Sequence, residues 1–302
     1  MASIEDKQSL ARDFYKTTIA PLLPERLRFK LRYYAKHGYW PDLDKPRSLM
    51  EKIVWLLRND RTPLRADVAD RIKVRAFVQA HAPQCKLPAH LWVGTDFTAA
   101  VWDKLPQRFV IKGNHGSQMT RIVDKTCDAY ESVRDEAQAW LSVDYAAFFG
   151  EWVYEAADRT LVVEERLQFE SVVPPDWKFL CGNGRVLIAQ LDIGRFVNHR
   201  RNLYDREFNL FKGARIAFPV GEYVFKPAIW DDAIKIAEQL AKPFDFIRVD
   251  LYMINDEIYF GEMTNYPGAG MDALQPTALD FELGKLVQIK TQEHKEAQSH
   301  ED

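Results

Sequence analysis

Features that would assign this 302-residue chain to several classes of protein are missing from its sequence. It has only three cysteines, and Cys85, Cys127 and Cys181 form neither a C-x-x-C pair nor the spacing of a zinc site. We therefore expect reduced thiols that fill buried space. No run approaches the ~18 apolar residues that a membrane span needs, and residues 1–16 contain no apolar leader segment. These absences predict a soluble protein of the cytoplasm.

Neither sign of charge is in excess. The chain carries 41 lysines and arginines against 44 aspartates and glutamates, a formal net charge of −3, so we expect no nucleic-acid partner. The exception is local, because basic side chains alternate with apolar ones within residues 23–36. Such a basic amphipathic helix can make a peripheral contact with an anionic membrane. A plain surface helix with one buried face is the alternative.

The order of helix-like and strand-like segments predicts an α+β fold. Helical patterns come first, including helices at about 48–58 and 66–80, and short apolar runs separated by turns follow. Two pairs of these runs flank glycine, asparagine or aspartate turns that are typical of antiparallel hairpins. We therefore expect a helical N-terminal region over 1–90, a mixed core over 91–290 and a polar tail over 291–302.

The first segment that could carry chemistry is a strand followed by a loop of small residues. The strand ends in Lys112 and opens into a loop that contains His115, Gly116 and Ser117. Backbone N–H groups of such a loop can approach phosphate oxygens, while the lysine supplies a positive charge and the histidine a further contact. The G-x-x-x-x-G-K-[ST] motif is absent, so an ordinary turn is the alternative.

The second segment is a hairpin whose strands carry two carboxylates. Asp250 closes one apolar run, and Glu262 follows on the return strand. Two carboxylates placed together repel each other unless they share a cation, and Mg²⁺ prefers such oxygen ligands. Arg248 lies two residues before Asp250, on the same strand face, where it could stabilise charge on a transferred phosphoryl group. Solvated acids on an ordinary hairpin are the alternative.

A third segment is uninformative by itself. An apolar strand leads into Glu164, Glu165 and Leu167, where backbone groups could bind a flat adenine. Asp176 and Lys178 follow in the next apolar run. An acid after the strand could bind ribose hydroxyls, and the lysine could bind phosphates.

The fourth segment concentrates positive charge. Amides and cationic side chains alternate there, at Arg195, Asn198, His199, Arg200 and Arg201. Planar guanidinium groups suit an anionic substrate or a reactive phosphate. A solvated basic loop is the alternative.

In their order along the chain, these four segments resemble the ATP-grasp superfamily. Arg248, Asp250 and Glu262, followed by Pro267-Gly268, are similar to the catalytic arginine and metal-ligand hairpin of D-alanine–D-alanine ligases. The strand ending in Lys112 is similar to the phosphate-binding strand and loop of that fold. The resemblance further implies that residues 164–167 hold adenine and that Arg75, in the stretch 70–75, takes the position of a phosphate-contacting lysine.

More narrowly, the chain resembles the TupA-like ATP-grasp family, which is associated with teichuronopeptide and other surface-polysaccharide synthesis. The likeness covers residues 25–288. The matching stretches are residues 51–55, 114–117, 176–179, 198–205 and 261–264.

This chain departs from the family pattern at two places. The phosphate-binding loop usually has a glycine where this chain has Gln118, which predicts a less pliable loop. The superfamily prefers an asparagine two residues after the metal-binding glutamate, but Thr264 stands there and Asn265 comes next. Strand alternation puts Thr264 on the face of Glu262. We favour Asn265 slightly as the third metal ligand, because an amide oxygen suits magnesium better.

The resemblance implies an α+β ATP-grasp fold and a ligase that needs ATP and Mg²⁺. A carboxylate, from a small molecule or a glycan, would attack the γ-phosphate of ATP, and an amine would then displace phosphate from the acyl phosphate. Lys112 and Lys178 would hold phosphates, and Asp250 and Glu262 would hold Mg²⁺. The substrates implied are a uronic acid of a bacterial surface polysaccharide or its precursor, and an amino acid or amine.

The resemblance also implies roles for the remaining basic residues and their neighbours. Arg248 and Arg200 would stabilise the transition state, while Asn198, His199 and Arg201 would orient the substrate carboxylate.

Two other functions stay open at this point. A glycosyltransferase would need a D-x-D motif at a strand end, and the only one here, Asp42-Leu43-Asp44, lies in a connector bounded by prolines. A nucleotide-binding scaffold without turnover is the second possibility.

Overall fold

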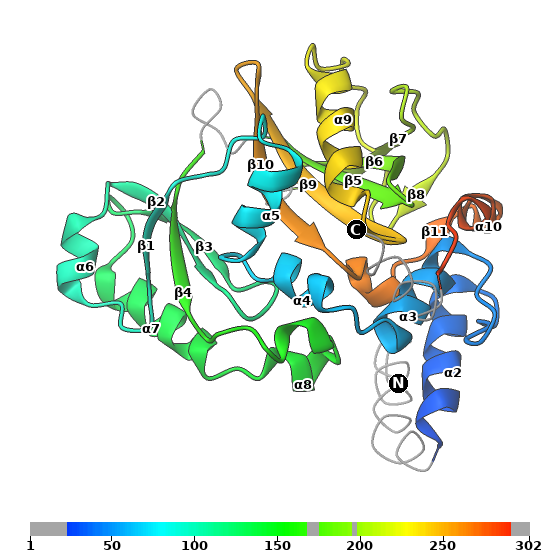
Figure 1. Ribbon diagram of the computed structural model, residues 1–302, viewed down its shortest axis with the longest axis horizontal. Coiled ribbons are helices and arrows are strands. Elements are labelled where there is room, and N and C mark those ends of the chain that lie inside the picture. The colour runs from blue at the N-terminus through cyan, green and yellow to red at the C-terminus, as the bar shows by residue number, and fades with distance from the viewer. Residues whose placement is uncertain (1–22, 168–174, 195–197, 291–302) are drawn as a thin grey trace, which may run out of the picture.

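Two antiparallel sheets form the framework of the chain in the computed structural model, which describes residues 23–167, 175–194 and 198–290 (Figure 1). The smaller sheet has the strand order β1-β4-β2-β3, and the larger has the order β10-β9-β5-β6-β7. Helices pack on both sheets, so the α+β architecture agrees with the expectation from sequence. The expected tail at 291–302 lies outside the described residues.

The smaller sheet buries one face under helices. Its strands are β1 (His90–Gly94), β2 (Arg108–Gly113), β3 (Thr120–Asp124) and β4 (Leu161–Glu165), and the helices are α6 (Ala99–Lys104) and α7 (Tyr130–Leu141). Phe109 and Ile111 alternate along β2 and are fully buried, as expected for a strand with one covered face. They belong to one apolar cluster with Val133 and Ala137 of α7. This packing fixes the direction in which β2 runs into the glycine loop.

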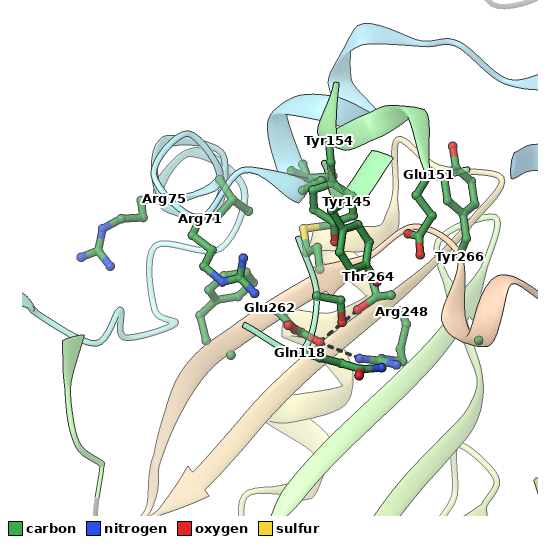
Figure 2. Close-up of a pocket in the computed structure, with 18 of the residues that line it drawn as sticks. Arg71, Arg75, Gln118, Tyr145, Glu151, Tyr154, Arg248, Glu262, Thr264 and Tyr266 are labelled. Carbon is green, nitrogen blue, oxygen red and sulfur yellow. Dashed lines mark hydrogen bonds and ion pairs between the residues drawn. The ribbon is translucent and has the colours of Figure 1, made fainter. Parts of the chain in front are cut away.

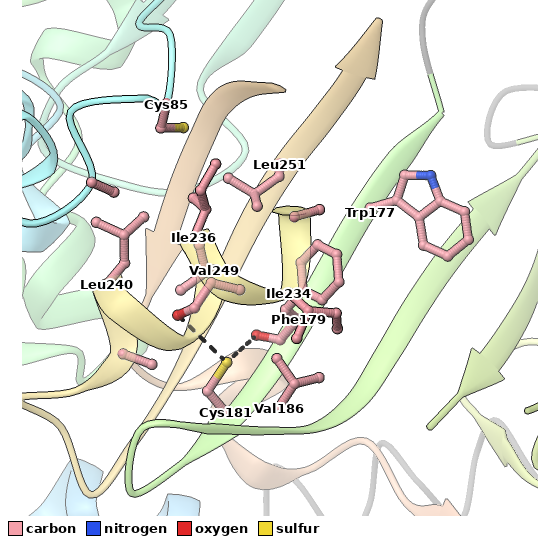
Figure 3. Packing of buried hydrophobic residues seen from close by; sticks show 14 of the residues in the cluster. Cys85, Trp177, Phe179, Cys181, Val186, Ile234, Ile236, Leu240, Val249 and Leu251 are labelled. Atoms are coloured by element: carbon pink, nitrogen blue, oxygen red, sulfur yellow. Dashed lines mark hydrogen bonds between the residues drawn. The ribbon is translucent and has the colours of Figure 1, made fainter. Parts of the chain in front are cut away.

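The larger sheet carries the second core. Its strands are β5 (Asp176–Gly182), β6 (Arg185–Ile193), β7 (Arg200–Tyr204), β9 (Phe246–Ile254) and β10 (Glu257–Thr264). Helices α5 (Val74–His81) and α9 (Trp230–Ala241) contribute apolar side chains to the cluster on one of its faces. Figure 3 shows Phe179 and Val249 of the sheet packed beside Ile234 and Leu240 of α9.

The three cysteines differ in their surroundings. Cys85 and Cys181 are buried members of the cluster under α9, as the sequence predicts for filler residues (Figure 3). Cys127 is exposed, so the prediction of burial is wrong for that residue. All three are free thiols.

The opposite face of the larger sheet is apolar at one end only. Leu180, Ile188 and Leu203 pack there with residues of α2 (Glu25–His37), α3 (Leu49–Asn59) and α10 (Thr277–Leu286). Farther along the same face the side chains are charged. The α2–α5 segment therefore packs into the sheet cores, and the proposed division of the chain at residue 90 stays a prediction.

The expected helix at 66–80 is two helices. Helix α4 (Pro63–Ala69) ends at Asp70, and α5 begins at Val74. The Asp70 carboxylate accepts hydrogen bonds from the backbone N–H groups of Ile72 and Lys73. Because a side chain that binds its own following backbone competes with continued helix, the chain turns here and carries Arg71 toward the phosphate-binding loop.

Several short elements were not expected from sequence. Strand β7 forms in the basic segment for which a loop was considered. Others lie between the main elements: α8 (Tyr145–Phe149), β8 (Arg215–Ile216) and β11 (Leu274–Gln275). None of the helices within the described ranges is long and apolar enough to cross a membrane.

The buried side chain of Arg65 connects α4 to the β9–β10 hairpin by hydrogen bonds. The Arg65 side chain is 1% exposed, and its Nε donates to the Asp60 carboxylate at 2.7 Å. Its Nη1 donates to the carbonyl of Phe246 and to Oδ1 of Asn265. The Asn265 amide donates in turn to the Arg65 carbonyl. This network ties the N-terminal helices to the end of β10.

We expect Arg65→Ala to lower the free energy of unfolding by about 3–5 kcal/mol, because Asp60 would remain buried without its counter-ion. Urea denaturation followed by circular dichroism measures this loss. The neighbouring Arg61→Ala is the matched control, since Arg61 is exposed and its contacts are hydrogen bonds to two carbonyls and a cation–π contact with the Trp152 ring at 5.2 Å. Equal stability of the two variants would contradict a structural role for the Arg65 network.

Candidate active site

A row of charged residues crosses the larger sheet. Antiparallel register places Glu262 of β10 opposite Asp250 of β9, and Asp250 opposite Lys178 of β5. A bulge between Phe260 and Glu262 lies at Gly261, where an added Cβ would meet the Asp250 carbonyl at 3.0 Å. The sheet register thus brings together three of the site residues that the sequence predicts.

The row is held by close ion pairs. The Arg248 guanidinium binds both oxygens of Asp250, at 2.6 Å and 2.7 Å. Lys178 Nζ donates to Asp250 at 2.7 Å and to Asp176 at 2.5 Å. Arg248 also donates to Oε1 of Glu262 at 2.8 Å. Paired geometry of this kind is what allows charges to stay buried in a sheet.

One carboxylate of the row faces the solvent-accessible pocket. The side chain of Asp250 is 3% exposed, whereas that of Glu262 is 46% exposed. Glu262 Oε1 accepts from Arg248 and from the Thr264 hydroxyl, while its Oε2 accepts no hydrogen bond from the described residues. Glu262 therefore has an oxygen that can take a further cation.

Burial and neighbouring charges oppose each other at these two acids. Burial acts to raise the pKa of Glu262, but Arg248 and Lys178 hold that pKa at about 2. At Asp250 burial prevails over the same two cations, and Glu262 adds to it, so the pKa of Asp250 rises to about 6. The three carboxylates of the row outnumber its two cations, which favours the approach of a further positive charge.

The donor set fits magnesium bound together with phosphates. The described residues contain no group of three histidines, cysteines, aspartates or glutamates that could hold a metal alone. Mg²⁺ in nucleotide sites commonly uses one or two carboxylates plus phosphate and water. Glu262 supplies one such carboxylate, while both oxygens of Asp250 are bound by Arg248 and Lys178, so a role for Asp250 as a second ligand stays a prediction.

The glycine loop that follows β2 is held by residues far away in sequence. Arg71 Nη1 donates to the carbonyls of Gly113 and Gly116, at 2.6 Å and 2.9 Å. The Asn114 amide donates to Asp70 and accepts from the Arg71 backbone N–H. The turn between α4 and α5 therefore fixes the loop on the smaller sheet. Sequence reasoning passed over Arg71 and noted only Arg75.

Lys112, at the end of β2, lies beside this loop and is paired. Its Nζ donates to Glu164 of β4 at 2.5 Å, and His90 lies 3.4 Å from the same carboxylate. Burial acts to raise the pKa of Glu164, but Lys112 and His90 lower it to about 2. Strand pairing between β2 and β4 thus joins the predicted phosphate lysine to the predicted adenine segment.

A cavity of about 280 Å³ is lined by residues of both sheets. Figure 2 shows residues of the larger sheet, the glycine loop and the α4–α5 turn converging on it. Among the predicted site residues, those that line it are Arg75, Ser117, Glu164, Arg248, Glu262 and Thr264. Sequence reasoning missed other lining residues, namely Arg71, Tyr145, Glu151, Tyr154 and Tyr266.

Three of the predicted site residues, His115, Glu165 and Asn265, have other partners and do not line this cavity. The His115 ring bonds the Trp140 carbonyl and lines a second cavity. Glu165 accepts a hydrogen bond from the backbone N–H of Ala89. The Asn265 amide is buried against Arg65. The sequence favours Asn265 slightly as the third metal ligand, whereas the side chain that contacts Glu262 is that of Thr264. The choice between the two ligands stays a prediction.

Two other predicted binding residues, Gly116 and Leu167, do not line the cavity. Gly116 packs so closely on the Tyr145 ring that an added Cβ would lie 2.8 Å from ring carbons. Leu167, just after β4, is partly buried. Their nucleotide-binding roles stay predictions.

The basic segment forms its own ion cluster at the β7 edge of the larger sheet. Arg201 lies opposite Asp192 and donates to it at 2.6 Å, and His199 lies 3.1 Å from the same carboxylate. The His199 ring also stacks on Phe218 at 3.6 Å. Arg201 and His199 are thus occupied by Asp192 and do not line the cavity.

The basic segment also includes Arg195, Asn198 and Arg200. Arg200 and Asn198 are described but do not line the cavity either, and Arg195 lies outside the described residues. The roles predicted for Arg200 in catalysis and for the other residues in substrate binding stay predictions.

Comparison with known proteins gives one family match. A family model described as TupA-like ATPgrasp matches residues 51–288. No curated protein matches the chain. The family and the ATP-grasp fold expected from sequence are thereby confirmed, and ATP with Mg²⁺ is the cofactor pair of ATP-grasp ligases.

Solved structures give weaker likenesses. A D-alanine–D-alanine ligase from Bacillus anthracis complexed with ATP is 14% identical over 73% of this chain and 66% of its own, with a TM-score of 0.40. A phosphoribosylamine–glycine ligase from Thermotoga maritima is 11% identical over 72% of this chain and 50% of its own, with a TM-score of 0.41. This chain therefore spans two thirds or less of their length. The assignment rests on the family match.

We expect Asn265→Ala to lower the free energy of unfolding by about 1–3 kcal/mol, because groups of Arg65 lose their partners, and to leave the magnesium dependence of ATP binding unchanged. Thr264→Ala should raise the magnesium concentration needed for ATP binding. Urea denaturation and a magnesium titration of ATP binding separate the two effects. A stable Asn265→Ala protein that needs more magnesium would show that the amide is the ligand.

Gln118 stands in the cavity loop with a φ of 62°, a left-handed conformation that favours glycine. We expect Gln118→Gly to raise the free energy of unfolding by about 1 kcal/mol, because the strain of the side chain is removed. Gln118→Ala keeps the strain and is the control. Thermal denaturation measures both, and equal midpoints for the two variants would argue against a strained loop.

Proposed function

Because the chain belongs to the TupA-like ATP-grasp family, we propose that it is an ATP- and Mg²⁺-dependent ligase that joins an amine to a carboxylate. The carboxylate is first phosphorylated by ATP, and the amine then displaces phosphate from the acyl phosphate. The observation that carries this proposal is the ion-paired array of Arg248, Asp250 and Glu262. Arg248 and Glu262 of this array line the cavity together with Ser117 of the glycine loop.

The residues of the cavity have separate tasks in this reaction. Ser117 and the backbone of its loop, with Arg75, would hold phosphates, as helix- and loop-derived donors do. Bound Mg²⁺ would neutralise charge on those phosphates and would be held by Glu262 with Asp250. Arg248 is held bidentately by Asp250, and its Nη2 also donates to Glu262. It would stabilise the transferred phosphoryl group.

Lys178 stabilises this array through its ion pair with Asp250. Its ammonium is buried between Asp176 and Asp250, and these acids raise the pKa of Lys178 against the effect of burial. Lys178 thus stays charged and keeps Asp250 in place. Because both partners of the Lys178 ammonium are carboxylates, it can bind a phosphate only after it releases one of them.

We further propose that the carboxylate is a uronic acid of a bacterial surface polysaccharide or its precursor, and that the amine is an amino acid. The support is the association of the TupA-like family with such glycans. The glycosyltransferase alternative is disfavoured by the D-x-D segment itself. The Asp42 carboxylate accepts from the backbone N–H groups of Asp44 and Lys45, and Asp44 pairs with Arg26, so the motif forms a surface turn.

The peripheral membrane contact also stays a proposal. Helix α2 exposes Arg32 and Lys36, one turn apart on one face, and Tyr34 on another face. Tyr34 stacks on the exposed Trp40 at 4.8 Å. Basic and aromatic side chains together suit the interface of an anionic membrane.

We expect the protein to consume ATP only when a suitable carboxylate and amine are both present or the acyl phosphate is trapped, and to release ADP and inorganic phosphate. The assay measures ADP with glucuronate or galacturonate and with glycine, L-alanine, L-glutamate or L-lysine, and identifies the products by mass. AMP and pyrophosphate would contradict the acyl phosphate route. ATP binding without turnover across the panel would favour the scaffold.

Arg248→Ala is the control that assigns turnover to this cavity. We expect its kcat to fall by about 10² or more, while ATP binding changes little, because the arginine acts on developing charge. An effect confined to KM would make Arg248 a binding residue only.

A further inference from the structure

The cavity has two chemically different ends. Arg71 and Arg75 lie at one end, where phosphates would be attracted. At the other end, Glu151 lies among the tyrosines 145, 154 and 266 (Figure 2). Because Glu262 and Arg248 lie between the two ends, a ligand at the Glu151 end would adjoin the reacting phosphate rather than the adenine segment.

Glu151 is a carboxylate without a counter-ion. It begins the short turn at Trp152–Tyr154 and points toward the side of the cavity where Thr264 and Arg248 lie (Figure 2). No described residue gives it a hydrogen bond or an ion pair. Burial, with the charge of Glu262, raises the pKa of Glu151 to about 7. A partly buried acid in this situation is stabilised by any cation that enters.

The walls around Glu151 also suit a cation. The rings of Tyr145 and Tyr154 meet edge to face at 5.1 Å. The Tyr266 hydroxyl is fixed by a hydrogen bond from the Trp152 indole at 2.9 Å. Burial raises the pKa of Tyr145 and of Tyr266 to about 12, so the rings stay neutral at physiological pH. Neutral aromatic rings attract ammonium groups through their negative faces.

We propose that the end of the cavity formed by Glu151, Tyr145, Tyr154 and Tyr266 binds the ammonium group of the amine substrate, with Glu151 as its counter-ion. The inference rests on the proposed ligase function and deepens it, because it assigns the second substrate to a place. Phosphates bind at the arginine end and the ammonium at the glutamate end. The amine is thereby held beside the array that generates the acyl phosphate.

The alternative role for Glu151 is that of a further magnesium ligand beside Glu262. The two roles differ in the step that they affect. A magnesium ligand acts already when the acyl phosphate forms, whereas an ammonium-binding residue acts only when the amine enters.

The experiment compares Glu151→Gln with the wild-type protein in the two half-reactions. Hydroxylamine is uncharged at neutral pH and traps an acyl phosphate as a hydroxamate, so it reports the first step without the amine. The complete reaction uses the uronate and amino acid of highest turnover in the panel above. Glu155→Gln is the matched control, because Glu155 is exposed, four residues away, and does not line this cavity.

We expect Glu151→Gln to raise the KM for the amino acid by about 10–100-fold, the effect of losing a charged hydrogen bond. Hydroxamate formation should fall far less, which also shows that the variant is folded. An unchanged KM for the amino acid would overturn the proposal, and so would hydroxamate formation that recovers only at higher magnesium. If the wild-type protein forms no hydroxamate with any carboxylate, the proposed function itself fails, before Glu151 is tested.

Discussion

The bidentate pair of Arg248 and Asp250 is the interaction on which the candidate site depends. Asp250 is buried in the middle of a sheet, so it requires both Arg248 and Lys178 to remain there. Side chains alternate along a strand, and a slip of β9 by one residue would turn Arg248 and Asp250 into the apolar core under α9. The hydrophobic pattern that fixes the sheet register therefore also fixes the charged row, and Glu262 is placed by the same register.

The N-terminal helices are a structural part of this site. Arg65 holds the end of β10 through Asn265, and Arg71 holds the loop after β2 through its carbonyls. Helix α4 and the turn that follows it thus contact both sheets that line the cavity. A substitution in these helices can therefore alter the distance between the glycine loop and the β9–β10 hairpin, even when the substituted residue contacts neither of them.

Charge is distributed along the cavity in a way that suits two substrates of opposite sign. Cations gather around the loop side, and excess carboxylate gathers from Glu262 toward Glu151. A ligase of the proposed kind must bring a phosphorylated, anionic group and an amine together. In a partly desolvated cavity such a division of charge orients both reactants before any bond forms.

The sequence by itself determined those elements that depend on residues close together along the chain. Apolar runs on either side of a turn predicted the hairpin that carries Asp250 and Glu262, and the glycine loop after Lys112 predicted a place for phosphates. Tertiary structure decided what depends on distant contacts. Asn265 turns from the hairpin because Arg65, 200 residues away in sequence, binds its amide. His115 faces the Trp140 carbonyl, and Arg71 and Glu151 meet the cavity only through folding. Spacing along the chain says nothing about such partners, since the packing of separate elements selects them.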